Sequence, residues 1–257
     1  MPIRTAEQYL DSLRDDREVY IGGDRVKDVT KDARFAGAAE TMADLLQMQH
    51  EPSLQDVLTY SSPSSGDRVG MSHIQPSSRE DVKSRGDAMQ LWMDTTCGML
   101  GRSPDYKNVM VSAWAAAAAS FKRDTFDGSD NIKNFYELVR ENDLMMTHVL
   151  VNPQVDRSRP AHLQESEIVA QIVKETDEGM IVRGARMVAT LCALANEIVV
   201  MPAALTWQTD EQHKTTNYAF GFAIPTNTPG LKFICRPPVA HLDAASPMDG
   251  PLSLRYD

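Results

Sequence analysis

The sequence lacks long apolar runs, and this sets the first limits on what the chain can be. Charged residues are interspersed from Arg4 onward, so the N-terminal region predicts neither a signal peptide nor a transmembrane helix. Cysteine is scarce: Cys97, Cys192 and Cys235 are far apart and in no CxxC arrangement. We therefore expect no metal site and no disulfide framework, but buried apolar thiols in a reducing compartment, with the cytoplasm as the expected location.

The chain also has fewer basic than acidic residues. The chain has 26 Lys and Arg against 36 Asp and Glu, which gives a formal net charge of −10 at pH 7. Proteins that bind nucleic acid or anionic membranes need clustered positive charge, so we expect neither partner. No G-x-G-x-x-G motif follows a strand pattern and no P-loop is present, so any nucleotide would have to be bound in another way.

Helical patterns dominate the first part of the chain. Thr5-x-x-Gln8 and Ser78-Arg-Glu-Asp81 are typical of helix starts, and Pro104 suits the first turn of another helix. Between the first two starts, Gly22-Gly23-Asp24 indicates a β-hairpin. The apolar spacing and these signals predict helices near residues 5–13, 32–49, 78–100, 104–119 and 131–141.

Strand patterns follow after about residue 145. Alternating and β-branched residues separated by Gly, Pro, Asn or Asp predict strands at 182–190, 197–201, 218–224 and 231–235, and Asp177-Glu-Gly179 indicates a tight turn. Helices first and strands afterwards predict an α+β fold with two segregated units. We expect a helical domain over residues 1–144 and a β domain over residues 145–257.

One hexapeptide between two predicted helices can carry chemistry. In Gly101-Arg-Ser-Pro-Asp-Tyr106, a glycine permits a left-handed cap and Pro104 starts a new helix. Arg102 and Tyr106 then lie beside an interhelical loop, where a positive fork and a phenol could bind a phenol or a carboxylate. Taken alone, the hexapeptide favours a plain helix break, with Arg102 capping carbonyls and Tyr106 packed at the surface, over a binding site.

A second unusual segment lies where the helical part gives way to the β part. His148 is surrounded by Met145-Met146 and Val149-Leu150-Val151, a context in which a histidine is usually a core residue. The polar residues Gln154, Asp156 and Arg157 follow Pro153 and could hold a polar ring edge or a phosphate. Ligand clefts favour such domain boundaries.

Taken together, these segments resemble the 4-hydroxyphenylacetate 3-hydroxylase family. The resemblance covers essentially the whole chain, with its motifs in the same order. Besides Gly101–Tyr106, the matching segments are Arg4–Arg14, Asp56–Tyr60, Glu141–Leu144, Thr147–Arg157, Val182–Ala185, Ala189-Thr190 and Phe222–Lys232.

The resemblance implies a two-component flavin monooxygenase on an acyl-CoA-dehydrogenase-like fold. A separate NAD(P)H-dependent reductase would supply reduced FAD by diffusion, and the oxygenase would react it with O2 to a flavin C4a-hydroperoxide. A phenol, such as 4-hydroxyphenylacetate, would then gain a hydroxyl ortho to its own. Such members have an N-terminal helical domain, a middle β-barrel, and a C-terminal helical bundle that supplies the core of a homotetramer. That bundle has no counterpart here, so we expect an N-terminal portion.

The resemblance also implies roles for individual residues. Arg102, Tyr106 and His148 would meet at the phenolic oxygen, with His148 as proton acceptor, Arg102 stabilising negative charge and Tyr106 orienting the hydroxyl. The implied flavin contacts are His148, Val149, Leu150, Gln154, Val155, Asp156, Arg157 and Thr190. The implied substrate contacts are Arg102, Ser103, Tyr106, His148, Ala203 and Ala204.

Two departures leave alternatives open. Pro202-Ala-Ala-Leu205 stands where the family often has hydroxyl residues, so the substrate could be a chlorophenol, a nitrophenol or a tyrosine-like metabolite. The length leaves open a catalytically incomplete fragment. The iron–sulfur 4-hydroxybutyryl-CoA dehydratase shares the fold, but Cys97 has no nearby cysteine partner here.

Overall fold

The computed structural model describes residues 2–100, 102–124, 126–153, 155–156, 158–159, 161–164, 168–201 and 215–236. The α-helices in these ranges are α1 (Ala6–Ser12), α2 (Ala36–Gln47), α3 (Gln55–Leu58), α4 (Arg79–Thr95), α5 (Asp105–Ala116) and α6 (Ser129–Glu141). None of the described helices is both long and apolar enough to cross a membrane.

Short strands are spread along the whole described chain. They are β1 (Glu18–Ile21), β2 (Asp24–Val26), β3 (Thr59–Ser61), β4 (Arg68–Gly70), β5 (Lys122–Arg123), β6 (Phe126–Asp127), β7 (Met146–Val149), β8 (Gln171–Thr176), β9 (Gly179–Arg183), β10 (Glu197–Val200), β11 (Phe222–Pro225) and β12 (Lys232–Cys235). Helices and strands together confirm an α+β fold.

Local sequence signals place the helix starts correctly. Thr5 and Gln8 form a reciprocal capping box at α1, and Ser78 and Asp81 form one at α4. Each box pairs backbone N–H groups that the first turn of a helix leaves without partners. The predicted helix over 32–49 is α2, which buries Ala38, Ala39, Met42, Leu45 and Leu46 on its apolar face.

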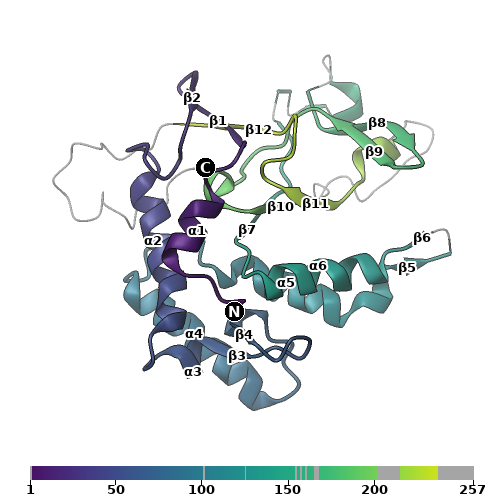
Figure 1. Ribbon diagram of the computed structural model, residues 1–257. Helices are drawn as coiled ribbons and strands as arrows, with labels where there is room; N and C mark the ends of the chain where they lie inside the picture. Colours follow the sequence, from purple (N-terminus) through teal and green to yellow (C-terminus); the bar gives the residue numbers. More distant parts are fainter. Residues whose placement is uncertain are drawn as a thin grey trace.

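Two hydrophobic clusters lie under these elements. The larger cluster joins α1 and α2 to residues of the β part, including Leu194, Ile198 and Phe233. The smaller cluster lies between α5 and α6 and includes Val111, Tyr136 and Met146 of β7. In Figure 1, α5 and α6 lie side by side next to β7, while α1 and α2 stand together at the other side. The predicted alanine helix ends at Ala116, followed by a 3₁₀ turn at Ala118–Phe121.

Two three-stranded sheets connect distant parts of the chain. β7 pairs parallel with β10, which pairs antiparallel with β11. β1 pairs parallel with β12, so the N-terminal hairpin and the last described strand share one sheet. This pairing differs from the expected segregation of helices and strands, because the hairpin near the N-terminus lies with the β part. Within the described residues the strands form open sheets and hairpins, not a closed barrel.

The predicted strand over 182–190 is wrong for most of its length. β9 ends at Arg183, and only isolated bridges follow, at Ala185 and Met187. Gly184 has a φ of +115°, and a Cβ there would lie 2.6 Å from the carbonyl oxygen of Val169. Backbone in this conformation leaves the extended strand geometry, so the strand ends at the glycine. The predicted strand over 218–224 is also shortened, because residues 215–218 form a 3₁₀ turn before β11.

The cysteines depart in part from the expectation of separate buried thiols. Cys192 and Cys235 are buried, but their sulfur atoms lie 4.0 Å apart because β12 returns to the N-terminal region of the fold. Cys97 is exposed, at a backbone φ of 52° just after α4. All three are free thiols.

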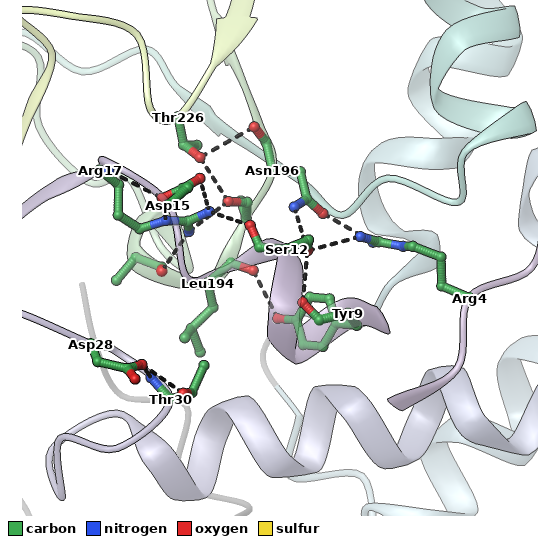
Figure 2. Close-up of polar contacts among 12 residues, drawn as sticks. Arg4, Tyr9, Ser12, Asp15, Arg17, Asp28, Thr30, Leu194, Asn196 and Thr226 are labelled. Carbon is green, nitrogen blue, oxygen red and sulfur yellow. Dashed lines mark hydrogen bonds and ion pairs between the residues drawn. The ribbon is translucent and has the colours of Figure 1, made fainter. Parts of the chain in front are cut away.

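A network of polar contacts fastens α1 to the turn that precedes β10 (Figure 2). The guanidinium of Arg17 donates to the carbonyl oxygens of Ala193 and Ala195 at 2.8 and 2.9 Å, and the Tyr9 hydroxyl donates to that of Leu194 at 2.8 Å. These bonds occupy backbone acceptors that burial would otherwise leave unpaired. The turn, and the strand β10 that follows it, is thereby fixed against the N-terminal helix.

Candidate functional site

The first turn of α5 and the strand β7 bring two of the predicted residues together. The Tyr106 hydroxyl lies 2.5 Å from Nδ1 of His148 and 3.2 Å from its Nε2. The ring centroids are 5.3 Å apart, with 58° between the ring planes. The shorter contact makes Nδ1 the hydrogen-bonding nitrogen, so an uncharged His148 can accept the hydroxyl proton there.

Two cations lie on the Tyr106 ring. The guanidinium carbon of Arg102 is 4.6 Å from the ring centroid, and Nζ of Lys107 is 4.0 Å from it. Positive groups at this distance are attracted to the negative face of an aromatic ring. The structure therefore brings Arg102, Tyr106 and His148 into one cluster and adds Lys107, which the sequence analysis did not single out.

Burial and positive charge set the protonation of this cluster. Burial, followed by the charges of Lys107 and Arg102, lowers the pKa of His148 to about 4. Burial raises the pKa of the Tyr106 phenol, although the Arg102 charge opposes that rise. At neutral pH the cluster thus holds an uncharged imidazole and an uncharged phenol beside two cations.

The residues before α5 fix the position of Tyr106 in the first turn of this helix. The Tyr106 N–H donates to the carbonyl oxygen of Ser103 at 3.1 Å, and Pro104 caps the helix with helical backbone angles. Burial raises the pKa of the Asp105 carboxyl, although a hydrogen bond from the Ser103 side chain opposes that rise. Ser103 is half-buried and its side chain serves the helix start. Gly101 lies outside the described residues.

The strand that carries His148 is fixed by Asn196. Its Oδ1 accepts from the Met145 N–H at 3.1 Å and from Arg4 at 2.9 Å, and its Nδ2 donates to Ser12 at 2.9 Å. The Asn196 N–H donates to the Met145 carbonyl oxygen at 2.7 Å. Figure 2 shows the Asn196 side chain pointing from the segment that leads into β10 toward Ser12 of α1 and toward Arg4. One side chain thereby sets the start of β7 relative to β10 and α1.

The end of β7 runs beside the segment 185–190. The Met187 N–H donates to the Val151 carbonyl oxygen at 2.8 Å, and the Thr147 hydroxyl donates to the carbonyl oxygen of Thr190. Val149 is buried in the core and Leu150 is half-buried. Thr190 thus lies next to β7.

The remaining predicted site residues either lie away from the Tyr106–His148 cluster or fall outside the described residues. Val155 is 59% exposed, and Asp156 accepts from Ser158 and pairs with Arg159 at 3.3 Å. Among the described residues, neither Val155 nor Asp156 forms a hydrogen bond or ion pair with Tyr106 or His148. The other predicted positions, Gln154, Arg157, Ala203 and Ala204, lie outside the described residues.

Several residues that build the site were missed. The sequence does not indicate that Lys107 is buried, because lysine is usually exposed. Lys107 also lies one position beyond the Gly101–Tyr106 motif. Arg17 acts through the carbonyl oxygens of Ala193 and Ala195, and the Asn196 side chain acts through the Met145 N–H; no spacing rule predicts either contact. Glu197 begins a buried strand, and burial raises the pKa of its carboxyl to about 7. In the described part of the chain, no three His, Cys, Asp or Glu side chains form a group that could hold a metal ion.

Comparison with known proteins shows which family this chain resembles. The family described as "4-hydroxyphenylacetate 3-hydroxylase N terminal" matches residues 5–257. The oxygenase component of 4-hydroxyphenylacetate 3-monooxygenase from Thermus thermophilus is 42% identical over 99% of this chain and 50% of its own length. The oxygenase component of 4-nitrophenol 2-monooxygenase from a Rhodococcus species is 35% identical over 98% of this chain and 48% of its own length.

A solved structure agrees with these relatives. The crystal structure of an oxygenase component of 4-hydroxyphenylacetate 3-monooxygenase, complexed with FAD and 4-hydroxyphenylacetate, superposes with a TM-score of 0.85 at 42% identity, covering 98% of this chain and 50% of that one. The chain spans about half the length of the curated relatives it matches. It belongs to the 4-hydroxyphenylacetate 3-hydroxylase family, and the part it matches is the N-terminal region.

Proposed function

We propose that this chain forms the N-terminal part of an oxygenase component that hydroxylates a phenol ortho to its hydroxyl, using reduced FAD and O2. The observation that carries the proposal is the contact of Arg102, Tyr106 and His148, which come from the loop before α5, from α5 and from β7. Relatives of 35% and 42% identity that are named as monooxygenase oxygenase components support it.

The cluster is suited to taking a proton from a phenol. A substrate hydroxyl can donate to the Tyr106 oxygen while Tyr106 donates to Nδ1 of His148, 2.5 Å away. His148 is uncharged at neutral pH, because burial and the nearby cations lower its pKa to about 4, so its Nδ1 can accept the hydrogen bond from Tyr106. The positive charge of Arg102 stabilises the phenolate oxygen, and electron density then rises on the ortho carbon that must be oxidised.

Residues along β7 and the adjacent segment fit a flavin. The Nε of Arg186 is buried and without a partner, and its Nη1 reaches Asn152 just after β7. This unpaired N–H donor could form a hydrogen bond to an acceptor atom at the edge of a bound flavin ring. When bound, reduced FAD would supply the activated oxygen atom. The residues proposed to hold it are His148, Val149, Leu150, Gln154, Val155, Asp156, Arg157 and Thr190.

For the substrate, 4-hydroxyphenylacetate is the first candidate. The relatives support it, since the 42% identical one is named for this compound. A nitrophenol is the second candidate, because the 35% identical relative is named for 4-nitrophenol. We propose that Ala203 and Ala204, together with Ser103, shape the pocket that decides between them.

The wider architecture follows from the same family. We propose a helical domain over 1–144 and a β domain over 145–257, the latter belonging to a β-barrel that precedes a C-terminal helical bundle in a homotetramer. A separate NAD(P)H-dependent flavin reductase would supply the reduced FAD, and the cytoplasm would be the location. The term "oxygenase component" in the names of the relatives supports a separate reductase.

A direct assay tests the proposal. The purified protein is mixed with reduced FAD, O2 and, in parallel, 4-hydroxyphenylacetate, 4-nitrophenol or tyrosine, and products are separated by chromatography. Formation of an ortho-dihydroxy product from at least one phenol is expected. Flavin oxidation to hydrogen peroxide with no hydroxylated product from any of the three would contradict it.

A further inference from the structure

Lys107 is a buried cation without an acidic partner. The residue is 5% exposed, and it forms no ion pair with any carboxylate in the described part of the chain. Its Nζ lies 4.0 Å from the Tyr106 ring centroid and 3.5 Å from the sulfur of Met110, a weak acceptor. An ammonium group with three donors is therefore left with one weak hydrogen bond and one ring face.

Keeping an unpaired ammonium out of water costs free energy. The cost appears in the pKa of Lys107, which burial, followed by the charge of Arg102, lowers to about 8. The group still carries its proton at pH 7. A buried charge that the fold leaves uncompensated calls for an anionic partner, and none is provided by the described residues.

The groups around His148 point to the same conclusion. From α5 and the residues before it, His148 is faced by Arg102, Tyr106 and Lys107, and the two charges that act on its pKa are both positive. From the sheet, its register partner on β10 is Val199, and the one carboxyl of β10, Glu197, pairs with Met146 instead. The cluster is thus a positively charged site lined by an uncharged phenol and an uncharged imidazole.

We propose that Lys107 is a positioning residue that, together with Arg102, holds a bound phenol in its ionised form. This inference rests on the proposed function, because it assumes that the site binds a phenol. Its chemistry follows from Coulomb attraction: a phenolate beside two cations is stabilised relative to the neutral phenol. The ionised ring is also the more nucleophilic one, so the same charge favours oxidation at the ortho carbon.

The experiment uses 4-nitrophenol, since the absorbance of its phenolate is separate from that of the phenol. Binding is followed by this absorbance from pH 5 to pH 9 in the purified protein and in the variants Lys107→Met, Lys107→Arg and Lys133→Met. Lys107→Met keeps length and apolar volume while removing the charge. Lys133→Met removes an exposed charge from α6, where Lys133 pairs with Asp130, and is the matched control.

We expect the bound probe to ionise at lower pH in the wild-type protein than in buffer. Lys107→Met raises the pKa of the bound probe by about one pH unit. Lys107→Arg retains most of the wild-type value, and Lys133→Met retains all of it. A merely structural role for Lys107 would alter affinity or thermal stability but leave the pKa of the bound probe unchanged.

Two results overturn the inference in distinguishable ways. If the wild-type protein binds the probe as phenolate and Lys107→Met does so equally, Lys107 has no such role while the proposed function stands. If the wild-type protein binds no phenol at all, the proposed function fails and the inference with it. Should Lys107→Met fold poorly by circular dichroism, Lys107→Gln gives the same comparison.

Discussion

The Tyr106 hydroxyl lies 2.5 Å from Nδ1 of His148, although the two residues are 42 positions apart and come from a helix and a strand. This contact joins the helical part of the chain to the sheet formed by β7, β10 and β11. It places an acceptor whose pKa is about 4 behind a phenol that can relay a proton. The first prediction concerns the two ends of this relay.

Replacing His148 by Ala removes the acceptor without touching Arg102. We expect kcat for hydroxylation to fall by about 100-fold or more, since general-base catalysis contributes that much. Flavin affinity should change by less than about 5-fold, and hydrogen peroxide should replace the hydroxylated product. Tyr106→Phe, which keeps the ring and its cation contacts, should show the same uncoupling. The measurement is the ratio of product to oxygen consumed, and an unchanged ratio in both variants would remove the relay from the mechanism.

Glu197 should make stability depend on pH. Burial raises the pKa of its carboxyl to about 7, above the usual value of 4.5, so the folded state holds a proton that the unfolded state releases. The stabilisation is therefore present below about pH 4.5 and is lost as pH rises through about 7. At pH 8, Glu197→Gln should be more stable than the wild type by about 1–3 kcal/mol in denaturant unfolding. Glu175→Gln, an exposed change on β8, is the control; equal effects of both variants at pH 8 would refute the assignment.

Asn196 should be a stability determinant. Asn196→Ala removes the bonds to Met145, Arg4 and Ser12 and leaves a backbone N–H unpaired at the start of β7. A loss of about 2–4 kcal/mol is expected, because an unsatisfied buried donor adds to the lost bonds. Asn142→Ala, which removes one exposed bond to Leu138, should cost less than about 1 kcal/mol. Equal losses in chemical denaturation would show that Asn196 does not position β7.

Adding a methyl group should have opposite effects on stability at Gly184, which ends β9, and at Gly86 in α4. Gly184→Ala puts a Cβ 2.6 Å from the Val169 carbonyl oxygen at a φ of +115°, so it should destabilise by about 2 kcal/mol or more. Gly86→Ala, inside α4 with nothing within 4 Å of the added Cβ, should stabilise by about 0.5–1 kcal/mol. Thermal unfolding of the two variants checks the sign of each change. A stabilising Gly184→Ala would refute the strained geometry at this turn.

Local signals were enough to predict α1, α2 and α4, because capping and apolar spacing act within one or two turns. The strand β7 was missed, since Met146–Val149 lies in an apolar run that its pairing with β10 alone identifies as a strand. The pairing of β1 with β12 joins the two ends of the described chain, and no local pattern encodes it. Non-local partners are what single-sequence patterns leave out.

In the candidate site, too, the contacts between distant parts of the chain could not be predicted from local sequence patterns. Arg102, Tyr106 and His148 were grouped through the family resemblance, because nothing in their spacing says that α5 packs against β7. Lys107 and Asn196 could not be found, since the role of Lys107 depends on burial and that of Asn196 on a backbone N–H and two side chains that folding brings together. The unpredicted cation on the Tyr106 ring matters most, because it changes the charge of the site.

Insertion of an oxygen atom from O2 into a phenol, with reduced FAD, is the reaction that we propose for this protein. The most direct measurement gives the purified protein reduced FAD and 4-hydroxyphenylacetate or 4-nitrophenol under ¹⁸O₂, followed by mass spectrometry of the product. We expect an ortho-dihydroxy product that carries one ¹⁸O atom. A product whose new oxygen comes from water, or no hydroxylated product from either phenol while FAD is bound and reoxidised, would contradict it.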